Sequence, residues 1–166
     1  FTQQHPAQAV SAMREIAHRA GVCGMIAGQT LDVKLEGCEP SRESVRYIHL
    51  HKTADLLTAP LEAGLILAGA DDEHVRAGIE YGQHLGLAFQ MVDDLLDVEG
   101  DAALLGKNTG VDAALGKLTW VALKGVDRTR RDAAEHIAAA VQALEKFDEN
   151  LNFLKDLAQS TLQRVQ

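Results

Sequence analysis

The sequence has few of the residues that interrupt helices or build strands. Only three prolines occur among 166 residues, and aromatic residues make up 4%. No segment alternates apolar and polar residues as a half-buried strand does, whereas alanine, leucine, glutamate and glutamine, which favour helices, are abundant. We therefore predict an all-α fold in one domain, since a chain of this length suits a single domain and can bury a core.

Cysteines, long apolar runs and an excess of basic charge are also scarce. Cys23 and Cys38 form neither a CxxC pair nor a zinc-binding pattern, so we interpret them as buried or idle thiols in a reducing compartment. No apolar run approaches the ~18 residues of a membrane span, and no signal-peptide pattern is found, which favours a cytoplasmic location. The formal net charge of −8 argues against a nucleic-acid partner and against anionic membrane surfaces.

Apolar periodicity and capping residues predict a series of helices. A first helix is expected from Pro6 to Glu36, and a second from Ser41 to Ala68 with a kink at Pro60. A third is expected over residues 72–98, followed by a glycine-rich loop over residues 100–116. Loops of that length inside a compact domain are often functional. Shorter helices are expected over residues 117–124, 127–147 and 150–164.

Three aspartates cluster in the motif Asp93-Asp94-Leu95-Leu96-Asp97, near the end of the third expected helix. On a helix, Asp93 and Asp97 lie about 40° apart, so their like charges repel. The apolar residues around them add a desolvation cost, and a divalent cation would remove both penalties. Because Mg²⁺ prefers oxygen ligands, we predict a magnesium site at Asp93, Asp94 and Asp97. A solvated acidic patch and a general acid/base pair of carboxyl groups are the alternatives.

Lysines and other polar residues occur at positions that suit an anionic ligand. Lys52 lies within the second expected helix, and Lys107 and Lys117 flank the glycine-rich loop. Ammonium groups together with metal-bound carboxylates can hold a diphosphate. The alternative is that these lysines are solvated surface groups. Gln29 and Asp32 share a face of the first helix, as either a buried polar pair or part of a site. The histidines show no metal-binding spacing, and we interpret them as structural or surface groups.

A set of short motifs, each weak by itself, occurs in a specific order. The set comprises Gly28-Gln29-x-x-Asp32, Lys52-Thr53, Gly86-Leu87-Ala88-Phe89-Gln90-x-x-Asp93-Asp94-x-x-Asp97, Gly106-Lys107 and Gly116-Lys117-x-Thr119. The ordered set resembles the trans-isoprenyl diphosphate synthases, also called polyprenyl synthetases, and especially bacterial farnesyl diphosphate synthases (geranyltranstransferases). The resemblance extends from about Ala12 to Arg164.

The resemblance implies an all-α, isoprenoid-synthase-type bundle around a central cavity, usually as a homodimer. It implies Mg²⁺-dependent transfer of an allylic prenyl group to isopentenyl diphosphate, with farnesyl diphosphate as the expected product. Asp93 and Asp97 would then be direct magnesium ligands, and Asp94 would support them, partly through water. Lys52, Lys107 and Lys117 would bind the diphosphate of the allylic substrate. Thr53 and Gln90 would position substrate and cation, and Phe89 would contact the reacting carbons. Gln29 and Asp32 would line the wall of the site.

The sequence departs from such enzymes in one large respect. The first aspartate-rich motif, its arginine pair and the N-terminal basic site for isopentenyl diphosphate are all absent from the 166 residues. Because the chain also begins at Phe1 rather than methionine, we interpret residues 1–166 as the C-terminal part of a single polyprenyl synthetase domain. Alone, they are expected not to condense prenyl diphosphates and to expose an apolar helix face. Alternatives are a non-catalytic regulatory subunit that heterodimerises with an active synthase, and a terpene cyclase relative.

Overall fold

The computed structural model describes residues 4–99, 110–148 and 150–164, and within these ranges every regular element is helical. This confirms the predicted all-α fold class. The elements are α1 (Pro6–Ala20), α2 (Met25–Lys34), α3 (Arg42–Ile48), the π-helix η1 (His49–Ala54), α4 (Asp55–Ala68), α5 (Asp72–Glu99), α7 (Val111–Ala114), α8 (Trp120–Lys124), α9 (Val126–Ala143), the 3-10 turn η2 (Leu144–Lys146) and α10 (Asn152–Gln163).

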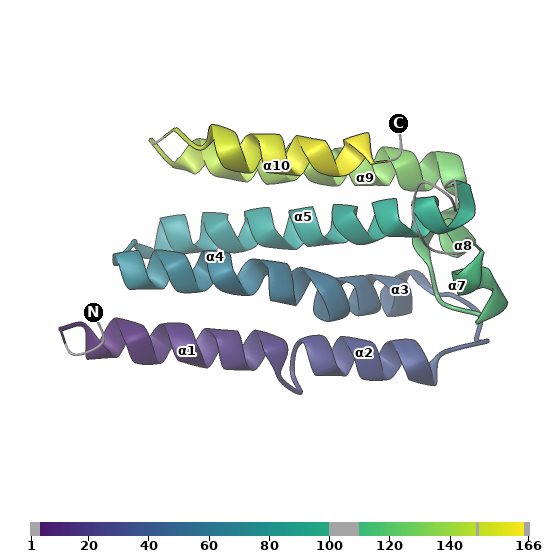
Figure 1. Ribbon diagram of the computed structural model, residues 1–166, viewed down its shortest axis with the longest axis horizontal. Coiled ribbons are helices and arrows are strands. Elements are labelled where there is room, and N and C mark those ends of the chain that lie inside the picture. The colour runs from purple at the N-terminus through teal and green to yellow at the C-terminus, as the bar shows by residue number, and fades with distance from the viewer. Residues whose placement is uncertain (1–3, 100–109, 149, 165–166) are drawn as a thin grey trace.

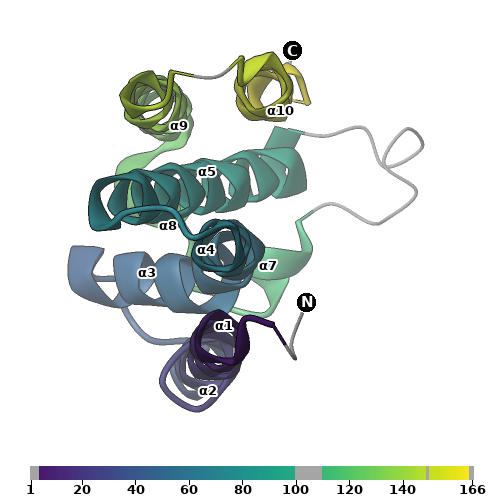
Figure 2. The ribbon, with the colours of Figure 1, turned by 90° about the vertical axis from the view of Figure 1, so that its left-hand side faces the viewer.

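The long helices lie along a common direction and are stacked in tiers (Figure 1). α1 and α2 follow one another along one side, and the continuous run α3–η1–α4 covers them. α5 lies in the middle, and α9 and α10 lie next to each other on the opposite side (Figure 2). The short helices α7 and α8 gather at one end, next to α3 and the end of α5.

Local residue chemistry explains where most helices begin. Ser41 and Ser44 form a capping box, in which each hydroxyl accepts from the other residue's backbone N–H at the start of α3. The Asp71 carboxylate accepts from two backbone N–H groups in the first turn of α5. Thr119 caps α8 in the same way. Gly69 adopts a left-handed conformation, with φ of 74°, and this ends α4.

The helix predicted from Pro6 to Glu36 is in fact two helices, so that prediction was wrong. The chain leaves the helix at Gly21 and re-enters it after Gly24, whose N–H donates to the Gly21 carbonyl. A Cβ on Gly24 would overlap the Arg19 carbonyl, so the turn requires glycine at this position. The second predicted helix is irregular at η1, whereas α4 continues through Pro60.

The last part of the chain also differs in detail from the prediction. The single turn α7 lies within residues predicted as loop, and α8 begins at Trp120, three residues later than expected. The reason is the Thr119 cap, which fixes the helix start after the predicted Lys117.

The core consists of two buried clusters that follow one another along α5. One joins α3, α5, α8 and α9 through residues such as Val45, Met91 and Trp120. The other joins α5, α9 and α10 through Tyr81, Ile137 and similar residues. α1 is tied to α4 by ion pairs from Arg19 to Asp55 and Glu62, whose nitrogen–oxygen distances are 2.7 and 2.5 Å.

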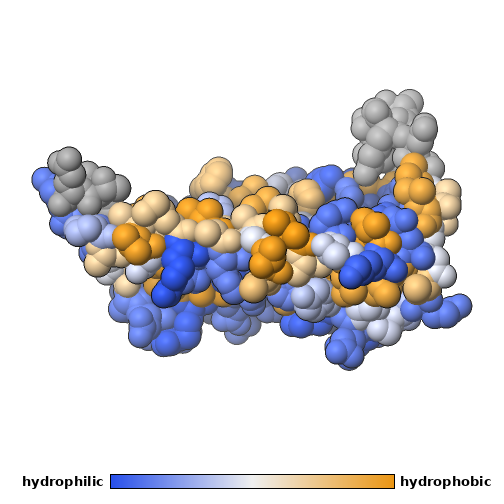
Figure 3. Space-filling model, turned by 90° about the horizontal axis from the view of Figure 1, so that it is seen from below, coloured by the Kyte–Doolittle hydropathy of each residue, from blue (hydrophilic) through white to orange (hydrophobic). Residues whose placement is uncertain are grey.

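The outer side of α1 and α2 is apolar. Figure 3 shows hydrophobic side chains along this face, separated by polar ones. Exposed members are Val10, Met13, Ile16, Val22, Ile26 and Val33. This surface, called here the α1–α2 face, matches the expected exposed apolar helix face. In the described ranges, no helix is both long and apolar enough to cross a lipid bilayer.

Candidate functional site

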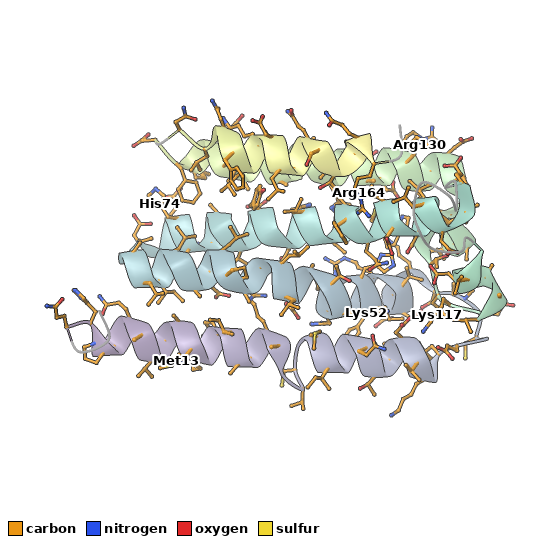
Figure 4. All side chains as sticks on the ribbon, in the orientation of Figure 1. Met13, Lys52, His74, Lys117, Arg130 and Arg164 are labelled. Atoms are coloured by element: carbon orange, nitrogen blue, oxygen red, sulfur yellow. The ribbon has the colours of Figure 1, made fainter. Side chains whose placement is uncertain are left out.

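Two lysines from separate parts of the chain meet at one buried carboxylate. The Lys52 Nζ lies 2.7 Å from Asp32 Oδ2, and the Lys117 Nζ lies 3.0 Å from the same oxygen. Lys117 also contacts Glu36 Oε1 at 2.6 Å. Asp32 is almost fully buried, whereas Lys52 is about one-third exposed. Figure 4 shows both lysines at the same end of the molecule, beside α7.

These contacts favour the ionised forms of Asp32 and Lys117. Burial by itself would raise the pKa of Asp32, but hydrogen bonds from Lys52 and Lys117 outweigh it, and the pKa is lowered. The pKa of Lys117 is raised, chiefly by its hydrogen bond to Glu36 and also by Asp32, despite partial desolvation. Two ammonium groups are therefore held side by side against a carboxylate, as an anion-binding site requires.

The π-helix η1 positions Lys52 and Thr53. A π-turn inserts one extra residue per turn, and such segments are frequent at functional sites. Two glycines let neighbouring helices approach it closely. A Cβ on Gly28 would overlap the backbone nitrogen of Lys52, and one on Gly86 would overlap Ala54. The glycine motifs in α2 and α5 thus have a structural reason, namely the close contact of both helices with η1.

Behind the lysines, hydrogen bonds link Thr53 to the aspartate motif. The Thr53 hydroxyl donates to Gln90 Oε1 at 2.8 Å, and Gln90 Nε2 donates to Asp94 Oδ1 at 3.2 Å. Asp94 Oδ2 accepts from the backbone N–H of Trp120 at 2.7 Å and lies 3.3 Å from His49 Nε2. Asp94 is only 2% exposed, and its two oxygens are both engaged by protein groups.

Asp97 and Asp93 lie in different surroundings. The Asp97 carboxylate accepts from the backbone N–H groups of Val111 and Asp112 at 3.3 and 3.0 Å, which attaches α7 to the end of α5. Asp93 is about one-third exposed, and the nearest nitrogen of Arg164 lies 3.9 Å from its carboxylate. Of the three aspartates, Asp93 is therefore the one whose side chain is most open to solvent.

The lysine cluster and the Asp94 network border one small polar cavity. Its volume is about 40 Å³, and its lining includes Lys52, Gln90, Asp94, Asp112, Lys117 and Thr119. Such a volume accommodates water or one small polar group. The cavity is thus a polar recess between two lysines and the acidic end of α5.

Other predicted residues lie outside this recess. Gln29 is exposed on α2 and borders a shallow surface depression away from Lys52, although Asp32, one turn later, is buried in the cluster. Phe89 is 36% exposed, and the Arg164 guanidinium lies over its ring, 4.8 Å from the centroid. Lys107 lies outside the described residues.

Several residues of the site were not predicted from the sequence. His49, interpreted as structural or surface, is buried at 2% exposure next to Asp94, and its Nδ1 has no partner. Glu36 holds Lys117, and the Trp120 amide holds Asp94. Arg164 lies beside Asp93 from the last helix.

The carboxylates suit magnesium by donor type. Within the described ranges, no three His, Cys, Asp or Glu side chains are grouped as a complete metal site. Mg²⁺ does not need one, because it typically takes one or two carboxylates and completes its shell with water and phosphate oxygens. Asp93 and Asp97, one turn apart, can supply such a pair, since a carboxylate oxygen that accepts one N–H keeps a second lone pair.

Comparisons with known proteins identify the family of the chain. The polyprenyl synthetase family profile matches residues 2–157, and the chain belongs to that family. It is 38% identical over 159 residues to farnesyl diphosphate synthase of Escherichia coli, covering 93% of this chain and 53% of the relative. It is also 38% identical to geranylgeranyl pyrophosphate synthase 3 of Arabidopsis thaliana, covering 86% of this chain and 41% of the relative.

Solved structures show the same fold. The geranyltransferase of Helicobacter pylori, complexed with magnesium and isoprenyl diphosphate, superposes with a TM-score of 0.77 at 30% identity, covering 93% of this chain and 50% of that one. A decaprenyl diphosphate synthase from Rhodobacter capsulatus gives a TM-score of 0.83 at 30% identity, with coverages of 95% and 60%. The chain thus spans about half the length of the curated relatives it matches.

Proposed function

We propose that this chain supplies the diphosphate- and magnesium-binding half of a prenyltransferase that joins an allylic diphosphate to isopentenyl diphosphate. The observation that carries the proposal is the convergence of Lys52 and Lys117 on Asp32, beside the carboxylates of α5. Relatives named as farnesyl and geranylgeranyl synthases support the reaction class. Among the products of that class, we propose farnesyl diphosphate, on the motif resemblance to bacterial farnesyl synthases.

In this proposal, different residues bind the diphosphate and the magnesium ion. Lys52 and Lys117 hold the diphosphate of the allylic substrate through charge-assisted hydrogen bonds, and Asp32 keeps both ammonium groups in place. Asp93 and Asp97 hold magnesium, which acts as a Lewis acid on the departing diphosphate. The Thr53–Gln90–Asp94 chain fixes η1 relative to α5, so the lysines and carboxylates keep one geometry.

The proposal also includes a homodimer. An apolar side chain that stays in contact with water forgoes roughly 1.5–3 kcal/mol of burial energy, so the α1–α2 face favours contact with more protein. The two-fold axis of a homodimer would place two copies of this face together. The partner substrates would be allylic and isopentenyl diphosphates, with Mg²⁺ as the cofactor.

Calorimetry with geranyl diphosphate, with and without Mg²⁺, tests the site. We expect the 166-residue chain to bind the ligand only when Mg²⁺ is present. Lys117→Ala should weaken binding at least tenfold, because one of two charge-assisted contacts is lost. Lys124→Ala, which changes an exposed lysine on α8, should bind like the wild type. Binding that needs no Mg²⁺, or that Lys117→Ala leaves unchanged, would contradict the proposal.

A further inference from the structure

A second cavity, much larger than the polar recess, lies at the other end of the bundle. Its volume is about 510 Å³, within the range of small-molecule sites, and it lies between the α4–α5 hairpin and the residues Leu144, Phe147, Leu151 and Leu154. His74 lies at its rim, and Figure 4 shows this residue at the opposite end of the molecule from Lys52 and Lys117. The cavity is therefore separate from the proposed diphosphate site.

The walls of this cavity are apolar and long. The larger aliphatic and phenylalanine side chains are Leu61 and Leu65 from α4, Leu144, Phe147, and Leu151 and Leu154 at the start of α10. The lining residues of α4 and those of α5 each extend over about two turns, or roughly 10 Å at 1.5 Å per residue. An elongated molecule lying along the helices fits this shape better than a compact one.

The phenol that lines the cavity is already hydrogen-bonded within the protein. The Tyr81 hydroxyl donates to the Leu154 carbonyl at 2.8 Å, which joins α5 to α10 and satisfies the one phenol among the described lining residues. Tyr81 is 1% exposed, and desolvation raises its pKa to about 12. A ligand would therefore meet a mainly apolar surface inside the cavity.

The charges at the rim exclude an anionic head group. Among the described residues that line the cavity, Asp71 is the only fully charged one, and it is paired with His74 at 2.8 Å. These lining residues include no lysine or arginine, so a diphosphate or carboxylate would face a carboxylate without a cationic partner among them. This is the opposite of the recess at Lys52 and Lys117, where two ammonium groups face the ligand.

We propose that this cavity is a binding site for an uncharged, elongated hydrocarbon such as a prenyl alcohol. Apolar cavities of about 150 Å³ bind benzene in other proteins, and this cavity is about three times larger. Farnesol is apolar over most of its length and carries no charge. The inference does not depend on the proposed prenyltransferase activity, because neither the lysines nor the carboxylates take part.

Equilibrium dialysis of the 166-residue chain with radiolabelled farnesol tests the site, in EDTA so that no magnesium-dependent binding contributes. We expect saturable binding of one farnesol per chain, and at least tenfold weaker binding of farnesyl diphosphate. Ala68→Phe places a large side chain at the cavity rim and should weaken farnesol binding at least tenfold. Ala138→Phe, at an exposed position of α9, is the matched control and should bind like the wild type.

Three results would overturn the proposal. They are an absence of saturable farnesol binding, equally tight binding of farnesyl diphosphate in EDTA, and unchanged binding by Ala68→Phe. The last result would place farnesol elsewhere, for example on the α1–α2 face. Circular dichroism of each variant checks the fold, and Ala70→Phe provides a second filled cavity if Ala68→Phe proves unfolded.

Discussion

Neighbouring aspartates of the α5 motif differ sharply in what surrounds them. Asp94 is buried and accepts from the Trp120 amide and the Gln90 side chain, whereas Asp93 is about one-third exposed. Helical geometry gives the angle between the two side chains but not this difference. The difference depends on Trp120, which lies 26 positions later in the sequence and is brought to Asp94 by the Thr119 cap.

This contrast predicts different effects on stability. Asp94→Ala leaves the Trp120 amide and the Gln90 side chain without their acceptor, which should lower the free energy of unfolding by about 2–3 kcal/mol. Asp93→Ala should change it by no more than about 0.5 kcal/mol, because most surface substitutions have small effects. Urea unfolding followed by circular dichroism measures both. Equal losses for the two variants would show that Asp94 has no special structural role.

Asp93, whose replacement should have little effect on stability, should in contrast be important for magnesium binding. Binding of Mg²⁺ with inorganic pyrophosphate should raise the melting temperature of the wild-type chain, because a ligand that binds only the folded state stabilises it. Asp93→Ala should lose most of that increase, since it removes the most exposed of the three carboxylates. The exposed Asp156→Ala on α10 serves as the control and should keep the increase. A full increase in Asp93→Ala would remove Asp93 from the metal site.

Among the elements, the break between α1 and α2 and the π-helix η1 were the features that the sequence did not reveal. Apolar spacing continues through Gly21–Gly24, so periodicity alone predicts one helix there. The π-helix has no residue signature of its own, because it arises where α2 and α5 approach η1 at Gly28 and Gly86. The general helical content, and the ends at Pro6, Ser41 and Gly69, were predictable because proline, caps and turn residues act locally.

A test of this close packing uses two glycines. Gly28→Ala would force a Cβ into the backbone of Lys52, so we expect a loss of about 1–3 kcal/mol in unfolding free energy. Gly64 lies on α4 with nothing within 4 Å of its added Cβ. Gly64→Ala should therefore stabilise the chain by about 0.5–1 kcal/mol, because alanine favours helix. Urea unfolding provides both values, and a neutral Gly28→Ala would contradict the close contact.

For the molecule as a whole, a pair of histidines joins the central helix to α9. His84 Nδ1 and His136 Nδ1 are 2.7 Å apart, so one ring donates and the other accepts. Desolvation, with a smaller contribution from His84, lowers the pKa of His136 to about 4. The groups that face the pair are Glu80, which favours protonation of His84, Asp132, which favours protonation of His136, and Arg46, which opposes both.

Stability should therefore fall in mildly acidic solution. In the unfolded chain, His136 has a pKa near 6.5, so below that pH the unfolded state binds a proton that the folded state does not. The contribution to stability is complete above pH 6.5 and is lost as the pH falls toward 4. Because the ring is partly exposed, we expect a loss of about 1–2 kcal/mol between pH 7 and pH 5. Urea unfolding at the two pH values measures it.

The variant His136→Gln separates the effect of the histidine on pH-dependent stability from the effect of carboxylate titration. His136→Gln keeps a hydrogen-bonding side chain but cannot titrate, so its stability should depend less on pH over the same interval. Asp32, whose pKa is lowered, loses its contribution only at more acidic pH and is common to both proteins. Identical pH dependence in wild type and variant would remove the histidine pair as the cause.

The exposed apolar α1–α2 face predicts that two copies of the chain associate through it. Met13 is 59% exposed and lies on the outer side of α1, away from the bundle (Figure 4). If two copies meet through this face, Met13→Glu places a charge where water is excluded, and the dissociation constant of the dimer should rise at least tenfold.

Leu157→Glu is the control: it changes an exposed leucine on α10, on the opposite side, and should leave association unchanged. Sedimentation equilibrium measures all three proteins. A wild-type chain that stays monomeric, or a larger effect of Leu157→Glu, would show that the α1–α2 face does not join two copies.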